Sequence, residues 1–121
     1  MSAMPFPPAF DDAVRRFNAG EYFEAHEGFE ECLDAVESDA RWDLLVALIQ
    51  VAVGYHKLAA GHPGAARMLG LGAEKLAAFD AVAWGLDVGR LRDRARADAD
   101  ALERGAAPAP EPPALRPARP S

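Results

Sequence analysis

The sequence lacks the features that are typical of disulfide-rich, secreted and membrane-spanning proteins. Cys32 is the one cysteine in 121 residues, which excludes a disulfide framework within the chain and favours a reducing compartment. No basic segment followed by an apolar one opens the chain, so no signal peptide is expected. The longest apolar stretch, residues 44–55, contains Gln50 and is too short to cross a bilayer. We therefore expect a cytoplasmic protein that has no membrane partner.

Positive charge is missing from one long segment. Residues 21–39 contain eight acidic residues and no lysine or arginine, whereas the whole chain has a net charge of -6. An acidic chain lacks the basic surface that nucleic-acid binding requires, so no nucleic-acid partner is expected. Arginines gather in residues 90–96, and Asp93, Asp98 and Asp100 are interleaved with them or follow them. This pattern indicates a solvated helix face, or a face that pairs with the acidic segment.

Signals for β-strands are also missing. No long alternation of apolar and polar residues occurs, and no Asn-Gly or Asp-Gly pair marks a hairpin. Apolar residues instead recur every three or four positions, which predicts helices. The predicted helices span residues 9–18, 22–37, 41–60, 63–79 and 88–104, and a linker carrying Trp84 precedes the last of them. The pattern predicts an all-α protein, a compact array of about five antiparallel helices.

Proline divides the chain into three parts. Six of the ten prolines lie in residues 105–121 and three more lie in residues 1–8. We expect a flexible N-terminus at 1–8, a helical domain at 9–104 and a disordered proline- and alanine-rich tail at 105–121. No aromatic residue follows Trp84, so nothing evident would fold the tail back onto the domain.

The segment 17–31 surrounds one imidazole with carboxylates. His26 and Glu30 lie one helical turn apart, and side chains at this spacing can share a metal ion. His56 on the central helix would be a third ligand, and Glu27 or a water a fourth. This hypothesis makes His26, Glu30 and His56 the ligands of a divalent cation, with His26 and Glu27 as catalytic residues.

A structural interpretation competes with this metal site. His26 lies at the edge of the apolar face and would bond Glu30, Gln50 or His56, in a buried network that fixes the register of two helices. Asn18 precedes a predicted helix end, where asparagine often bonds its own backbone. These alternatives stay open at the level of the sequence.

Three groups of residues resemble a known family. They are Phe17–Glu27 with Glu30, Leu48–Ala52 with Tyr55 and His56, and Gly61 with Gly64, Ala65 and Leu69. Together they resemble the domain of unknown function 309 family of small, all-helical bacterial and archaeal proteins. The resemblance implies an all-helical fold. It places a set of polar residues at the family's signature positions, namely Asn18, Glu24, His26, Glu27, Glu30, Gln50 and His56. On this basis Asn18, Glu24 and Gln50 are candidate ligand-binding residues.

Two functions from different classes follow. The first is an interaction or small-ligand-binding module organised around the Glu/His polar cluster. The alternative is a metal-assisted hydrolase that uses His26, Glu27, Glu30 and His56, so the sequence leaves open whether the protein is an enzyme. The candidate cofactor is a divalent metal ion. The candidate partners are a protein, a small molecule or a second copy of the chain in a homodimer.

Overall fold

The computed structural model describes residues 6–36 and 39–118. Its elements, in chain order, are α1 (Ala9–Asn18), α2 (Tyr22–Leu33), α3 (Ala40–Ala59), α4 (Ala65–Leu76), β1 (Val82–Ala83), β2 (Leu86–Asp87) and α5 (Val88–Glu103). The prediction of an all-α array is confirmed. α2 and α4 are shorter than the sequence pattern suggested, because their last apolar residues continue in turns.

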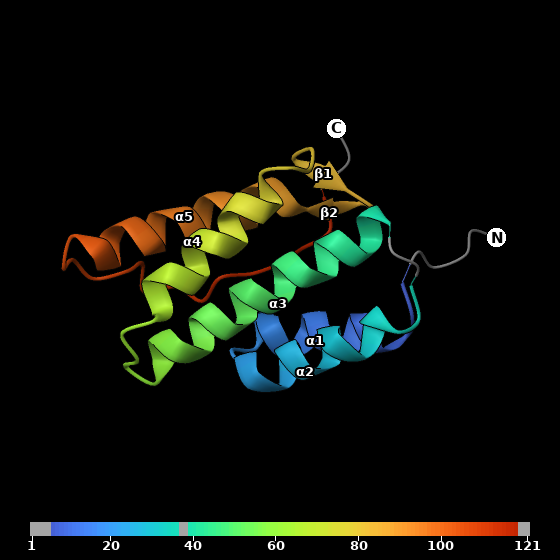
Figure 1. Cartoon of the computed structure of the whole chain (residues 1–121), viewed down its shortest axis with the longest axis horizontal. Coiled ribbons are helices and arrows are strands. Elements are labelled where there is room, and N and C mark those ends of the chain that lie inside the picture. The colour runs from blue at the N-terminus through green and yellow to red at the C-terminus, as the bar shows by residue number, and fades with distance from the viewer. Residues whose placement is uncertain (1–5, 37–38, 119–121) are drawn as a thin grey trace.

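The helices pack in the order in which they follow one another. α3 lies in the middle, with α1 and α2 on one side and α4 and α5 on the other (Figure 1). The apolar residues of α3 are buried around most of its circumference, as predicted for a central helix. Its fully or nearly fully buried residues are Leu44, Leu45, Ala47, Leu48, Val51, Ala52, Gly54 and Tyr55. No helix in the described part of the chain is long and apolar enough to cross a membrane.

Two glycines set how closely α3 and α4 approach each other. A Cβ atom added to Gly72 of α4 would lie 2.6 Å from Cγ2 of Val51, and one added to Gly54 of α3 would lie 2.7 Å from Cδ2 of Leu69. Neither distance leaves room for a side chain. The side of α4 that carries Gly72 is therefore its contact face with α3.

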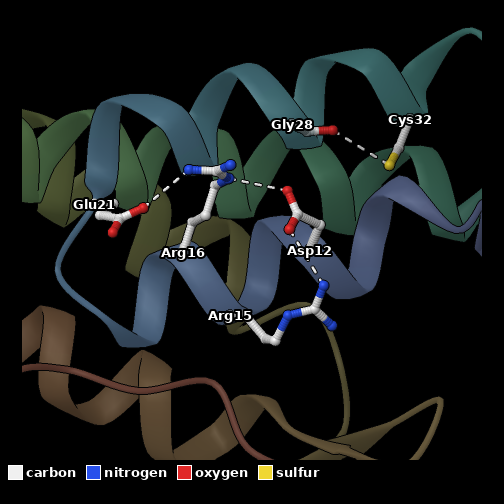
Figure 2. A network of polar contacts seen from close by, with 6 residues as sticks. All are labelled: Asp12, Arg15, Arg16, Glu21, Gly28 and Cys32. Atoms are coloured by element: carbon white, nitrogen blue, oxygen red, sulfur yellow. Dashed lines mark hydrogen bonds and ion pairs between the residues drawn. The ribbon is translucent and has the colours of Figure 1, made fainter.

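α1 and α2 are joined by both an apolar face and a charged bridge. Phe10, Ala13 and Phe17 of α1 are buried. On the solvent side, Arg16 donates a hydrogen bond to Asp12 (2.9 Å) and another to Glu21 (3.0 Å), as Figure 2 shows. The hydrogen bond from Arg16 holds the pKa of the Asp12 carboxyl below its usual value. Exposed bridges of this kind add little stability, so the apolar face carries the packing.

Cys32 of α2 is a core residue, and Figure 2 shows its side chain next to the backbone of Gly28. Its Sγ donates to the carbonyl oxygen of Gly28, 3.3 Å away. The thiol is free and buried, and burial raises its pKa. Cys32 is therefore a small apolar packing residue.

The linker before α5 contains a short antiparallel hairpin. Val82 pairs with Asp87 and Ala83 pairs with Leu86. The two turn residues, Trp84 and Gly85, both have positive φ values of 49° and 76°. Two-residue strands are too short to leave an alternating pattern, which explains why the sequence did not indicate them.

Trp84 anchors the linker to the helices, although its side chain is not fully buried. Its ring centroid lies 5.5 Å from that of Phe6 and 6.1 Å from that of Phe79, while 39% of the residue stays exposed. Phe6 is itself buried and stacks on Phe10. The expected flexible N-terminus at residues 1–8 is therefore wrong for Phe6, which is a core residue. Residues 1–5 lie outside the described part of the chain.

The expectation of a disordered tail is wrong for residues 105–118. This segment, red in Figure 1, runs back beside α5 toward the hairpin. Leu115 is 1% exposed, and its backbone N–H and carbonyl oxygen both bond the side-chain amide of Asn18. The backbone of Arg116 and Ala118 bonds that of Asp87 and Gly85. One buried leucine and a few polar anchors thus hold a segment that has no aromatic residue. Residues 119–121 lie outside the described residues.

We predict that Leu115→Ala lowers the thermal stability of the full chain. Truncating a buried leucine costs about 2–5 kcal/mol, and for a chain of this size each kcal/mol lowers Tm by roughly 4 °C. Glu111→Ala is the matched control, because the Glu111 side chain is exposed in the same segment. Thermal unfolding followed by circular dichroism measures both variants. Equal Tm values for Leu115→Ala and the unmodified chain would contradict the docked tail.

Candidate functional site

One surface brings together much of the polar cluster that the sequence indicated. We call it the Phe23 face, and its residues are Phe23, His26, Glu27 and Glu30 of α2 and His56 of α3. The four residues of α2 are spaced three or four apart, so they leave the same side of the helix. His56 comes from the neighbouring helix, and its ring centroid lies 5.5 Å from that of Phe23.

Phe23 lies against both imidazole rings of this face. Its ring centroid is 5.0 Å from that of His26, at an interplanar angle of 66°. Although it is a large apolar side chain, 46% of the residue is exposed. Phe23 is therefore a partly exposed surface residue that contacts two histidines, and it is not part of the core.

The orientation of His26 is set by its own helix. Its Nδ1 lies 2.6 Å from the carbonyl oxygen of Phe23. A carbonyl oxygen only accepts hydrogen bonds, so Nδ1 is the protonated nitrogen and donates. In the neutral ring Nε2 is then an acceptor, and it lies 3.7 Å from Oε1 of Glu30. Two acceptors therefore face each other across a gap that suits a donor or a cation supplied from outside.

The metal-site residues are brought together only in part. His26 and Glu30 are neighbours, and His56 reaches this face through its contact with the Phe23 ring. Within residues 6–36 and 39–118, no group of three or more His, Cys, Asp or Glu side chains is arranged to hold a metal ion. The catalytic roles predicted for His26 and Glu27 stay predictions.

The candidate ligand-binding residues lie in three different environments. Glu24 is exposed on α2. Asn18 uses both ends of its side-chain amide on Leu115, at 3.0 Å and 2.8 Å, rather than on its own backbone. Gln50 is half-buried on α3, and its Oε1 is fully buried with no hydrogen-bond partner among the described residues. The expected bond between His26 and Gln50 is not among those formed in this part of the chain.

The carboxylates of α2 are mostly uncompensated. Glu21 is paired with Arg16 and Glu30 faces His26. Glu24, Glu27 and Glu31 are exposed, and none of them forms an ion pair with another described residue. The arginines of α5 do not neutralise them, because those that form ion pairs in the described chain use the aspartates of α5 itself. The Phe23 face is therefore surrounded by negative charge.

A second polar cluster was not identified from the sequence. Asp98 of α5 is 1% exposed. Its Oδ2 accepts hydrogen bonds from the hydroxyl of Tyr55 (2.6 Å) and from Nε of Arg94 (2.8 Å). Its Oδ1 accepts one from the backbone N–H of Ala109 (3.2 Å). The helical period did place Asp98 on the inward face of α5, and an acidic residue at such a position was the signal that could have revealed the cluster.

The environment of Asp98 keeps Tyr55 protonated. Burial, followed by the hydrogen bond to Asp98, raises the pKa of the Tyr55 hydroxyl far above its usual value. Burial also raises the pKa of Tyr22, whose ring centroid is 5.6 Å from that of Tyr55. Tyr55 therefore acts as a permanent donor to Asp98 and not as an acid or base near neutral pH.

We predict that this donor makes the fold sensitive to alkali. Above about pH 10 the tyrosine of the unfolded chain ionises, while folded Tyr55 keeps its proton. Its contribution to stability is present below pH 10 and falls by about 1.4 kcal/mol per pH unit above it. Urea unfolding from pH 7 to 11 should show a smaller alkaline loss in Tyr55→Phe. Tyr22→Phe is the control and should keep the loss that is due to Tyr55. An unchanged alkaline loss in Tyr55→Phe would disprove the assignment.

A second prediction concerns the unpartnered oxygen of Gln50. Methionine has a similar length and no group that needs a hydrogen bond. A buried unsatisfied polar group costs about 1–3 kcal/mol, so Gln50→Met should raise the free energy of unfolding by about 1 kcal/mol. Gln50→Glu is the comparison variant and should lower it, since it adds a charge at the same place. A less stable Gln50→Met protein in chemical denaturation would contradict this interpretation.

The comparisons with known proteins identify a family and no function. A family model described as "Domain of unknown function (DUF309)" matches residues 10–69. This match runs from α1 to the first residues of α4 and contains the whole Phe23 face. No curated protein matches the chain, and no solved structure matches it.

Proposed function

The chain belongs to the DUF309 family, and we propose that it is an interaction module whose Phe23 face binds an arginine- or lysine-bearing segment of a partner protein. The proposal is carried by one observation. Nε2 of His26 and Oε1 of Glu30 are two acceptors 3.7 Å apart at the surface, and a guanidinium or ammonium group supplies the donors that both lack.

The aromatic ring beside this pair supports the same partner chemistry. A cation above the face of an aromatic ring is attracted by the ring's quadrupole. Phe23 is adjacent to His26 and nearly half exposed, so a basic side chain that reaches Glu30 also passes the ring. Its contacts with His26 and His56 hold the ring in place before binding, which lowers the entropy cost of association.

The charge around the face favours a basic segment over a neutral one. Glu24, Glu27 and Glu31 are exposed and unpaired among the described residues, and together with Glu30 they create a negative field. Such a field raises the association rate of a positively charged partner and weakens with added salt. It also disfavours acidic partners, and this gives the face its selectivity.

A bound metal ion is the competing cation for the same two acceptors. Zinc sites in proteins normally have at least three protein ligands, whereas His26 and Glu30 provide two. The hydrolase prediction therefore lacks a completed metal site in the described chain. The proposal places the module in the cytoplasm, where the free thiol of Cys32 stays reduced.

We predict that the Phe23 face binds a basic peptide in preference to an acidic one. The probe is a short synthetic peptide that combines arginine with tryptophan, and its control replaces each arginine by glutamate. Fluorescence anisotropy should show binding of the basic probe alone, weaker at higher salt. Phe23→Ala and Glu30→Gln should each weaken it by about tenfold, equivalent to about 1.4 kcal/mol. Glu103→Gln removes the same charge from an exposed site on α5 and should have no such effect.

Chemical-shift mapping and two controls test whether the peptide binds at the Phe23 face. Amide chemical shifts should change along α2 and around His56 when the basic peptide is added, and the melting temperatures of all variants should stay close to that of the unmodified chain. Equal weakening by Glu103→Gln would mean nonspecific charge attraction and would refute the proposal. Stoichiometric zinc binding that requires His26 would also refute it, in favour of the metal site.

A further inference from the structure

A cavity of about 700 Å³ lies between α5 and the C-terminal tail. The helix side contributes Arg90 and Arg94, and the tail side contributes Arg116. Prolines of the tail and Val82 of the hairpin supply apolar wall. Its volume is in the range of small-molecule binding sites, which combine apolar walls with a few charged groups.

The three arginines differ in whether their guanidinium groups already have hydrogen-bond or ion-pair partners. Nε of Arg94 donates to the buried Asp98, and its Nη2 donates to the carbonyl oxygens of Ala109 and Glu111. The donors of Arg94 are thus used to bind the tail segment that forms one side of the cavity. Arg90 and Arg116 are exposed, and their guanidinium groups have no partner among the residues that the structure describes. These two charges are available to a ligand.

The other charged group in the cavity wall, the carboxylate of Asp87, offsets only one of these two positive charges. Oδ1 of Asp87 accepts the backbone N–H of Arg90 at 3.0 Å, which makes it the cap of α5. Two guanidinium groups that line one cavity repel each other, and a bridging anion removes that repulsion. The cavity is therefore positively charged in a chain whose net charge is -6.

From this arrangement we propose that the cavity binds a small organic dianion, in which anionic oxygens bridge Arg90 and Arg116. Guanidinium groups match the geometry of phosphate and carboxylate oxygens, and two of them suit a phosphate ester or a dicarboxylate. The apolar wall of Val82 and the tail prolines would contact the body of the ligand. This site is independent of the Phe23 face, since it uses other elements and the opposite charge.

The test measures the binding of three probes by isothermal titration at constant ionic strength. Phenyl phosphate and phthalate are dianions with an apolar ring, and benzamide is the uncharged analogue. We expect at least one dianion to bind and benzamide not to bind. Whichever dianion binds identifies the ligand as a phosphate ester or a dicarboxylate. Binding of neither dianion, or equal binding of benzamide, would refute the site.

Paired variants with equal charge changes then locate the site. Arg90→Gln combined with Arg116→Gln should weaken dianion binding by about tenfold or more. Arg96→Gln combined with Arg104→Gln removes two exposed arginines that do not line the cavity, and it should leave binding unchanged. Circular dichroism confirms that both double variants are folded. Equal losses in the two double variants would mean attraction to net charge alone and would overturn the proposal.

Discussion

The buried carboxylate of Asp98 is the constraint on which the arrangement of α3, α5 and the tail depends. An isolated charge in the core would cost several kcal/mol, so it is tolerated only where donors surround it. Those donors come from three separate elements: the hydroxyl of Tyr55 on α3, the guanidinium of Arg94 on α5 and the backbone N–H of Ala109 in the tail. Moving any one of the three would remove one of the donors that compensate this buried carboxylate, so Asp98 favours a single arrangement of all three elements.

The tail extends this constraint to the first helix. Beyond Ala109 the chain continues to Leu115, which is buried and paired through its backbone with Asn18 at the end of α1. Helices that pack mainly against their sequence neighbours form an open array, and a segment joining the last helix to the first closes it. The same segment forms one wall of the arginine cavity, so the element that stabilises the array also creates a site.

The family model covers one of the two proposed sites and not the other. The Phe23 face falls inside residues 10–69, which the family model matches, whereas Arg90 and Arg116 lie beyond them. The two proposed sites, a face for a cation on the matched helices and a cavity for an anion on the remaining elements, carry charges of opposite sign.

Helical period determined most of the fold from the sequence, because apolar residues every three or four positions leave few other structures open. It also predicted the meeting of His26 and Glu30, which is a local consequence of i, i+4 spacing. Only tertiary structure decided the roles of Asn18, Asp98 and Leu115, since their partners lie up to 97 residues away and no local pattern encodes such pairs. The tail shows the reason most clearly: its composition favours disorder, but the buried Leu115 and hydrogen bonds to Asn18, to the hairpin and to the side chains of α5 order it.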